Sequence, residues 1–163
     1  MTTGPKALIR RRVGGILALL LGLGPAVVLA APSAEAYTPS AAVKAAYQTR
    51  VIQLVNAQRA MYHRGGLLPT YCPGWYATHW SYYLATSGQF YHQSMYPILR
   101  TCRATVAAEN LGRGNVSPER MVAAWMASPG HRANILDGRL TRIGVAAYFV
   151  NGQWTIATDF TRN

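Results

Sequence analysis

Between residues 41 and 62, apolar side chains return every three to four positions along the chain. Tyr47, Val51 and Val55 keep this spacing, and polar residues such as Gln48 stand between them. The period is that of an amphipathic α-helix with one face turned toward a core. We therefore predict a helix over 41–62, ended by Gly65-Gly66.

A second helix is predicted from Pro73, a residue favoured in the first turn, to Gly88, which ends it. The aromatic residues Tyr76, Trp80 and Tyr83 fall on one face of this helix. Large aromatic side chains contribute most to a fold when they are buried. We therefore interpret this face as part of the core rather than as a platform for a ligand.

The segment 89–111 shows no regular period and is expected to be a long loop with short elements. A further helix is predicted after it, with Ser117 as the N-cap and Pro118 in the first turn. This helix is expected to end where Ser128-Pro129-Gly130 breaks it.

The pattern changes to that of strands at the C-terminal end. Residues 142–150 and 153–160 are rich in residues that favour strands, and Asn151-Gly152 between them is typical of a type I′ hairpin. The short stretch 67–69 could add another strand. Helices followed by an antiparallel hairpin indicate an α+β domain in which helices cover a sheet.

The N-terminal segment 1–36 has the pattern of an export signal. Basic residues precede the apolar run 13–31, and Ala34-Glu35-Ala36 provides a signal-peptidase site. The alternative is a retained membrane anchor, because the apolar run is close to spanning length. We expect cleavage after this site, which leaves an extracellular domain at 37–163. The arginines are compatible with both the general secretory route and the twin-arginine route.

The composition narrows the class of protein. Half of the residues are apolar and 13% are charged, which excludes a disordered acidic chain or a coiled coil. The net charge is +11, and it becomes +8 when the export signal leaves with four basic residues and Glu35. Only four acids then remain, which excludes a carboxylate cage of the calcium type.

The basic residues are almost all arginines and are spread from Arg50 to Arg162. No cluster of them is dense enough for a nucleic-acid site, so we expect no specific nucleic-acid partner. Loose association with anionic cell-envelope polymers needs no dense cluster, and salt would weaken such association.

Cys72 and Cys102 would reach an oxidising compartment together, and a disulfide between them is the expected state. Their spacing fits neither a redox motif nor a zinc motif. A catalytic thiol paired with a histidine is the alternative.

His92, Glu109 and His131 are the residues that could carry chemistry. Both histidines stand beside turn residues, in segments that we interpret as loops, where functional sites concentrate. Glu109 follows an apolar stretch and is expected to be partly buried, so its carboxylate needs a partner. Two imidazoles and one carboxylate could hold zinc with an open position, or act as a general acid and base.

A resemblance supports this choice of residues. The run WMASPGHRANIL at 125–136 closely resembles a signature of the bacterial branch of the CAP superfamily, which includes cysteine-rich secretory proteins, antigen 5 and plant pathogenesis-related proteins. Further matches follow the order of that family and extend the resemblance from about Ala46 to Phe160: Leu54 to Arg59, Phe90-Tyr91-His92, Glu109-Asn110-Leu111, Ile143-Gly144-Val145 and Asp159-Phe160.

The resemblance implies a three-layer α-β-α sandwich with a cleft where two histidines and two acids meet. His92 and His131 match the two histidines, and Glu109 matches the first acid. Ser128 stands at the position of the second acid, which argues against a two-carboxylate mechanism but leaves two histidines able to bind a divalent metal. Ala108 replaces the glycine that is usual before the acid, a change expected to alter only the local backbone.

The resemblance implies ligand binding rather than one accepted reaction. We therefore expect a secreted, monomeric, non-enzymatic binding module for a small lipid-like or envelope ligand, with a cleft that can hold a divalent metal such as zinc. One alternative is a secreted hydrolase, dependent on a metal or on His and Glu, that acts on peptides or cell-wall material. Another is a basic ribonuclease that uses Glu109 with His92 or His131 as acid and base.

Overall fold

The structure, a computed structural model, describes residues 37–163. The export signal predicted at 1–36 lies outside the described residues. Within 37–163, none of the helices has the length and apolar character that crossing a membrane requires.

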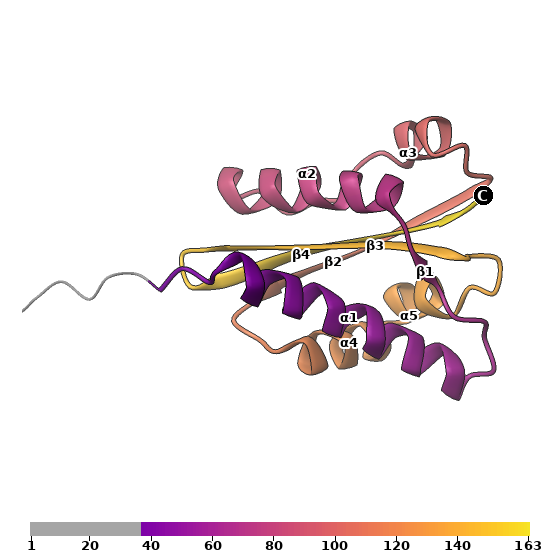
Figure 1. The fold of residues 1–163 in the computed structure, drawn as a ribbon, viewed down its shortest axis with the longest axis horizontal. Helices are drawn as coiled ribbons and strands as arrows, with labels where there is room; N and C mark the ends of the chain where they lie inside the picture. Colours follow the sequence, from indigo (N-terminus) through magenta and orange to yellow (C-terminus); the bar gives the residue numbers. More distant parts are fainter. Residues whose placement is uncertain (1–36) are drawn as a thin grey trace, which may run out of the picture. The chain divides into compact units, whose positions relative to one another are not determined.

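Helices and strands are interspersed along the described chain, and the last two elements are strands (Figure 1). In order they are α1 (Ala41–Met61), β1 (Leu68–Pro69), α2 (Tyr71–Ser87), α3 (Met95–Thr101), β2 (Val106–Gly114), α4 (Pro118–Ala127), α5 (Pro129–Leu136), β3 (Arg142–Val150) and β4 (Gln153–Arg162).

The strands form one mixed sheet in the order β1-β3-β4-β2. β3 and β4 are the predicted hairpin, and Asn151 and Gly152 at its turn have φ values of 51° and 75°, the positive values that a type I′ turn requires. β2 pairs antiparallel with β4 at one edge of the sheet, and β1 runs parallel to β3 at the other. The stretch 67–69, which could form a short strand, contributes β1 at residues 68–69.

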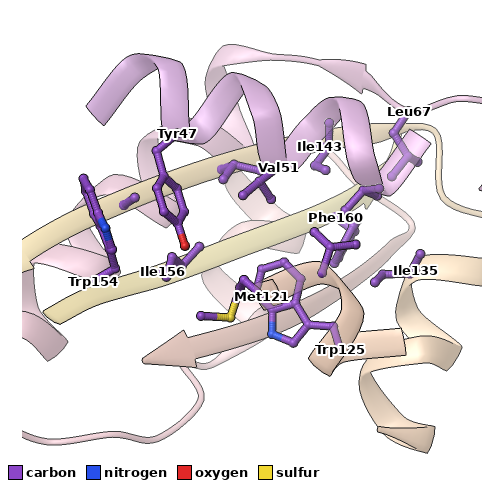
Figure 2. Packing of buried hydrophobic residues seen from close by; sticks show 14 of the residues in the cluster. Tyr47, Val51, Leu67, Met121, Trp125, Ile135, Ile143, Trp154, Ile156 and Phe160 are labelled. Atoms are coloured by element: carbon purple, nitrogen blue, oxygen red, sulfur yellow. The ribbon is translucent and has the colours of Figure 1, made fainter. Parts of the chain in front are cut away.

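Helices cover both faces of the sheet, so the domain has the three layers that the resemblance implied (Figure 1). α1, α4 and α5 lie against one face, and α2 and α3 lie on the other. The larger core is on the α1 side, where Trp154 and Phe160 of β4 pack against the helices. Figure 2 shows Tyr47 and Trp125 in this core, and the Trp125 ring N–H also donates to the Leu111 carbonyl at 2.8 Å.

The second core, under α2, is thin and is built mainly from small residues. Ala77 of α2 packs with Ala146 and Ala157 of the sheet. Gly144 on β3 allows the closest approach, because a Cβ at this position would lie only 2.1 Å from the backbone nitrogen of Gly74. α2 therefore lies directly on β3, with no room between them for large side chains.

This close packing corrects the interpretation of the aromatic stripe on α2 as core. The buried positions of the helix are Pro73, Ala77, Ser81 and Leu84. Tyr83 is exposed, and Tyr76 and Trp80 are only half-buried. Of these three aromatic residues, only Trp80 packs against the second core, so the prediction was wrong for Tyr76 and Tyr83. It assigned the core to the largest residues, whereas the close contact at Gly144 selects small ones.

Regular elements also arise where the sequence predicted a loop or a break. β2 lacks the β-branched pattern of a strand, and its pairing with β4 supplies the strand conformation instead. α5 begins at Pro129, inside the run that we interpreted as a break, because proline fits the first position of a helix. His131 consequently lies on a helix and not in a loop.

The first and third predicted helices are confirmed as α1 and α4. The N-cap of α4 is formed as expected, since the Ser117 hydroxyl accepts a hydrogen bond from the backbone N–H of Arg120. α1 ends at Met61, before Gly65-Gly66, because the chain already turns at His63, which has a left-handed φ of 54°.

Arg59, near the end of α1, fixes the position of α5. Its side chain is buried and donates hydrogen bonds of 2.6 to 3.2 Å to the carbonyls of Gly65, Ile135, Asp137 and Leu140. A buried guanidinium needs such a full set of acceptors. The helix that carries His131 is thereby tied to α1.

Candidate functional site

The site is built around the edge strand β2, where the connection between α2 and α3 passes Glu109. His92 lies in this connection, and its Nδ1 atom is 2.7 Å from Glu109 Oε1. The side chain of Glu109 is 2% exposed, whereas that of His92 is 59% exposed. The buried carboxylate therefore fixes one ring nitrogen of an imidazole that is otherwise open to solvent.

Gln93 completes the contacts of Glu109. Its backbone N–H donates to Oε1 at 3.2 Å, and its side-chain Nε2 donates to Oε2 at 2.8 Å. Nε2 also lies 3.1 and 3.0 Å from the two carboxylate oxygens of Asp159. Glu109 and Asp159 are directly opposite each other in β2 and β4, so their side chains share one face of the sheet. A single amide thus bridges two buried acids.

The surroundings of both acids favour protonation. Asp159 is fully buried, and burial, followed by the charge of Glu109, raises the pKa of Asp159 well above its usual value. Burial also raises the pKa of Glu109, although hydrogen bonds from Gln93 and His92 act in the opposite direction. Because two adjacent buried carboxylates repel each other, the pair favours keeping one proton, mainly on Asp159.

Asp159→Asn is expected to reduce the pH dependence of stability. An acid whose pKa is higher in the folded chain binds more protons when folded, so the free energy of unfolding falls as pH rises from the ordinary pKa of 3.8 toward the raised value. Asparagine keeps the shape of the side chain and one oxygen that can accept from Gln93 Nε2, but it does not ionise. When denaturant unfolding is measured at pH values from about 4 to about 8, the free energy of unfolding should therefore fall less for the variant than for the wild type. Equal losses would contradict the assignment of the proton to Asp159.

His131 approaches the site from α5, on the opposite face of the sheet from Glu109. Burial, and then the proximity of His92, lower the pKa of His131. Its imidazole is therefore neutral near neutral pH. The backbone carbonyl of His131 accepts a hydrogen bond from Asn110 Nδ2 at 3.1 Å. Within residues 37–163, its ring nitrogens make no hydrogen bond and so stay available to a ligand.

Two asparagines set the position of α5 relative to β2. Asn134, one turn after His131, donates to the Glu109 carbonyl at 3.0 Å and to Asn110 Oδ1 at 2.9 Å. Successive residues of a strand face opposite sides of the sheet, so Glu109 faces the α2 layer and Asn110 faces α5. Adjacent residues of β2 thus hold the two histidines from the two sides of one strand.

A groove of about 360 Å³ opens beside His131. Apolar side chains from β2 and α4, including Leu111 and Trp125, line it together with Ser128 and His131. Arg120 adds a positive charge to the lining, and none of the lining residues is acidic. The groove therefore suits a ligand with an apolar part and a neutral or anionic polar part.

Arg113 holds the connection that carries His92. Its guanidinium donates to the carbonyls of Leu84, Gly88 and Gln89 at 2.6 to 3.0 Å, at the C-terminal end of α2. It also lies over the ring of Phe90, 4.8 Å from the centroid. The first residues of the connection are thereby fixed to β2.

The predicted disulfide between Cys72 and Cys102 is confirmed. It joins the first turn of α2 to the end of α3, with a Cα–Cα distance of 5.6 Å. No free cysteine is present among the described residues, which include both cysteines of the chain, so the alternative of a catalytic thiol is excluded. The bond spans the segment that contains His92 and Gln93.

The structure brings the three candidate site residues to one edge of the sheet. Glu109 contacts His92, and His92 is close enough to His131 to affect its pKa. In the part of the chain that the structure describes, no three or more His, Cys, Asp or Glu side chains are grouped so that they could hold a metal ion. Metal binding by His92, Glu109 and His131 stays a prediction.

Sequence reasoning missed Gln93 and Asp159 as residues of the site. Asp159 was matched only as part of the family resemblance, and the predicted hairpin placed it in a strand without a partner for its carboxylate. Its pairing with Glu109 could not be inferred because β2 itself was not predicted. Gln93, next to His92, carried no signal beyond its place in the chain.

The chain is similar to a known protein family and to a bacterial relative. A model described as the cysteine-rich secretory protein family (CAP) matches residues 74–159. The uncharacterized protein YkwD of Bacillus subtilis is 32% identical over 120 residues, which cover 68% of this chain and 46% of YkwD. The chain therefore spans just under half the length of this relative.

Solved structures share the fold at low sequence identity. An extracellular protein of Bacillus anthracis that contains an SCP domain superposes with a TM-score of 0.66 at 18% identity, over 78% of this chain and 45% of that one. An outer surface protein of Borrelia burgdorferi gives a TM-score of 0.65 at 16% identity, over 71% of this chain and 91% of its own. Because the family model matches more than half of the 163 residues and the matched segment includes His92, Glu109, His131 and Asp159, this chain belongs to the cysteine-rich secretory protein (CAP) family.

Proposed function

We propose that this protein is a secreted, non-enzymatic binding module in which His92 and His131 take a divalent metal such as zinc. The groove beside His131 takes a small lipid-like or envelope ligand. The observation that carries the proposal is the His92–Glu109 contact of 2.7 Å on β2, whose next residue, Asn110, donates to the backbone carbonyl of His131. The similar solved structures are described as extracellular and outer surface proteins, which supports secretion.

The donor chemistry fits a metal held by two imidazoles. Histidines that bind a metal usually donate their other ring N–H to a carboxylate, which orients the ring. Glu109 stands in this relation to His92, and its second oxygen is occupied by Gln93. We therefore assign to Glu109 the role of orienting His92 rather than that of a ligand. A bound ion would supply positive charge that attracts an anionic or carbonyl oxygen of a ligand.

Zinc titrated by calorimetry into the purified protein is expected to bind weakly, because only two protein ligands are available. His92→Ala and His131→Ala are each expected to abolish this binding. Glu109→Gln retains the size of the side chain but loses the charge that orients His92, so the affinity should fall by roughly 10- to 100-fold.

His63→Asn provides the matched control. His63 is an exposed histidine just after α1, and its positive φ of 54° is one that asparagine tolerates. Zinc affinity should be unchanged in this variant. If zinc bound equally well to His92→Ala and His131→Ala, the site would not be the one proposed.

The groove beside His131 supports a small ligand with apolar character. Its apolar lining would bury the hydrocarbon part of such a ligand, and Arg120 lies where an anionic group could pair with it. The positive net charge would add loose, salt-sensitive association with anionic envelope polymers. We propose that the protein acts as a monomer without a specific nucleic-acid partner.

A hydrolase that acts on peptides or cell-wall material is the second candidate. It is favoured by the neutral imidazole of His131 beside the His92–Glu109 pair, because a neutral imidazole can accept a proton from water or a substrate. A broad turnover screen of the wild type against a His92→Ala/His131→Ala double variant separates the two functions. If the wild type turns over a substrate and the double variant does not, the protein is the hydrolase. If neither protein shows turnover, the binding module is favoured.

A further inference from the structure

The outer surface of α2 and the chain after it carry a row of aromatic rings that the site does not use. The row, which we call the aromatic face, consists of Trp75, Tyr76, His79, Trp80, Tyr83 and Tyr91. Trp75, Tyr83 and Tyr91 are 43%, 37% and 46% exposed. Tyr76 and Trp80 between them are half-buried. Large aromatic groups gathered on the surface of a monomer usually mark a binding surface.

The rings of the aromatic face hold one another in place. The ring of Trp80 stacks on that of Tyr83 with their centroids 5.1 Å apart. The ring centroids of Trp75 and His79 are 3.8 Å apart. The Tyr91 hydroxyl donates to the Tyr83 hydroxyl at 3.1 Å. The Trp80 ring N–H donates to the Tyr91 carbonyl, also at 3.1 Å. A ligand would therefore meet rings that are already ordered, which lowers the entropy cost of binding.

The aromatic face lacks formal charge. No lysine, arginine, aspartate or glutamate occurs between Arg64 and Arg100, a segment that contains the whole face, although the chain has a net charge of +11. Arg113 of β2 reaches the end of this segment, but its guanidinium is engaged by the carbonyls of Leu84, Gly88 and Gln89. A surface for nucleic acid or for anionic lipid places cations beside its aromatic residues. The polar groups of the face are hydroxyls, ring N–H groups and an imidazole. The chemistry therefore matches a ligand that is polar but uncharged.

The shape of the aromatic face matches an extended ligand. From Trp75 to Tyr83 the row covers roughly 12 Å along the helix, at 1.5 Å per residue. A hollow of about 230 Å³ lies at the start of the row, lined by Trp75 and Tyr76 together with Tyr71, Cys72 and Thr101. A β-linked sugar strand is straight, and its rings present flat faces of C–H groups with hydroxyls at their edges. Such rings can stack on the aromatic side chains while their hydroxyls stay hydrated.

We propose that the aromatic face binds an uncharged β-linked glycan strand, with sugar rings stacked on Trp75 and Tyr83. This surface goes beyond the proposed function and does not depend on the metal or on the groove beside His131. Tyr91 directly precedes His92 in the chain, so a bound strand would bring the His92 site close to the polymer.

Binding to chitin tests the proposal. Purified protein is mixed with chitin beads, and a soluble tetramer of the same sugar is titrated by calorimetry, at about 0.1 M and about 0.5 M salt. We expect binding at both salt concentrations, because the face carries no formal charge. Trp75→Ala and Tyr83→Ala should each weaken binding by roughly tenfold, which corresponds to about 1.4 kcal/mol. Trp75→Phe retains a ring and should keep most of the affinity.

Tyr62→Ala is the control, since Tyr62 is an exposed tyrosine, 41% accessible, at the end of α1 on the other side of the sheet. Circular dichroism checks the fold of each variant, and Tyr83→Ala carries the test if Trp75→Ala does not fold. A wild type that binds neither beads nor tetramer would overturn the proposal. So would binding lost at the higher salt, retention only on vesicles of anionic phospholipid, or a dimer that Trp75→Ala dissociates.

Discussion

Gly144→Ala is expected to lower the free energy of unfolding by about 3 kcal/mol or more. The added Cβ would lie 2.1 Å from the backbone nitrogen of Gly74 and 2.2 Å from the carbonyl carbon of Pro73. These are backbone atoms, which cannot rotate away as a flexible side chain can. α2 would have to move off β3, and the thin core beneath it would open. Urea unfolding monitored by circular dichroism measures the loss.

Gly130→Ala is the matched control for this prediction. A Cβ at Gly130 would meet nothing within 4 Å, and the residue lies in α5, where alanine is the better helix former. The same chemical change should therefore leave stability unchanged or raise it slightly. If Gly144→Ala were as stable as the control, α2 would not rest on β3 as the structure describes.

Loss of the disulfide between Cys72 and Cys102 is expected to cost about 3–4 kcal/mol and to lower Tm by roughly 10–20 °C. The bond joins residues with a sequence separation of 30 and so restricts the unfolded chain. In the folded chain it ties α3, a helix of only seven residues, to the first turn of α2. Scanning calorimetry of Cys72→Ala/Cys102→Ala against the wild type gives the difference in Tm.

A reducing agent provides the internal comparison for the disulfide. It should lower the Tm of the wild type to that of the double variant, and it should leave the variant unchanged. If the double variant retained the Tm of the oxidised wild type, the bond would contribute nothing to stability. The loop-closure argument would then fail for this protein.

Elements whose own residues determine their conformation were predictable from the sequence. α1 follows from its apolar period, and α4 from the cap at Ser117. The β3–β4 hairpin follows from Asn151-Gly152, because both residues accept the positive φ that the turn needs. In these cases the local chemistry and the final fold agree.

Elements that depend on their neighbours were not predictable in this way. β2 contains the buried polar residues Glu109 and Asn110, which are satisfied only by contacts from His92, Gln93 and α5. The sequence resemblance therefore identified Glu109 and the histidines, whereas the acid pair with Asp159 emerged only from the strand pairing. The exposure of the aromatic residues of α2 likewise depends on a glycine in another element.

The neutrality of α2 has an electrostatic consequence for the whole domain. The helices on the opposite face of the sheet carry Lys44, Arg50, Arg120 and Arg132, and Glu119 pairs with Arg50. In the α2 layer the only helical cation among the described residues is Arg100 of α3, so positive charge is distributed unevenly across the layers. In the field of an anionic surface, this asymmetry produces a torque that turns α1, α4 and α5 toward that surface before contact. The aromatic rings of α2 would then face away from that surface.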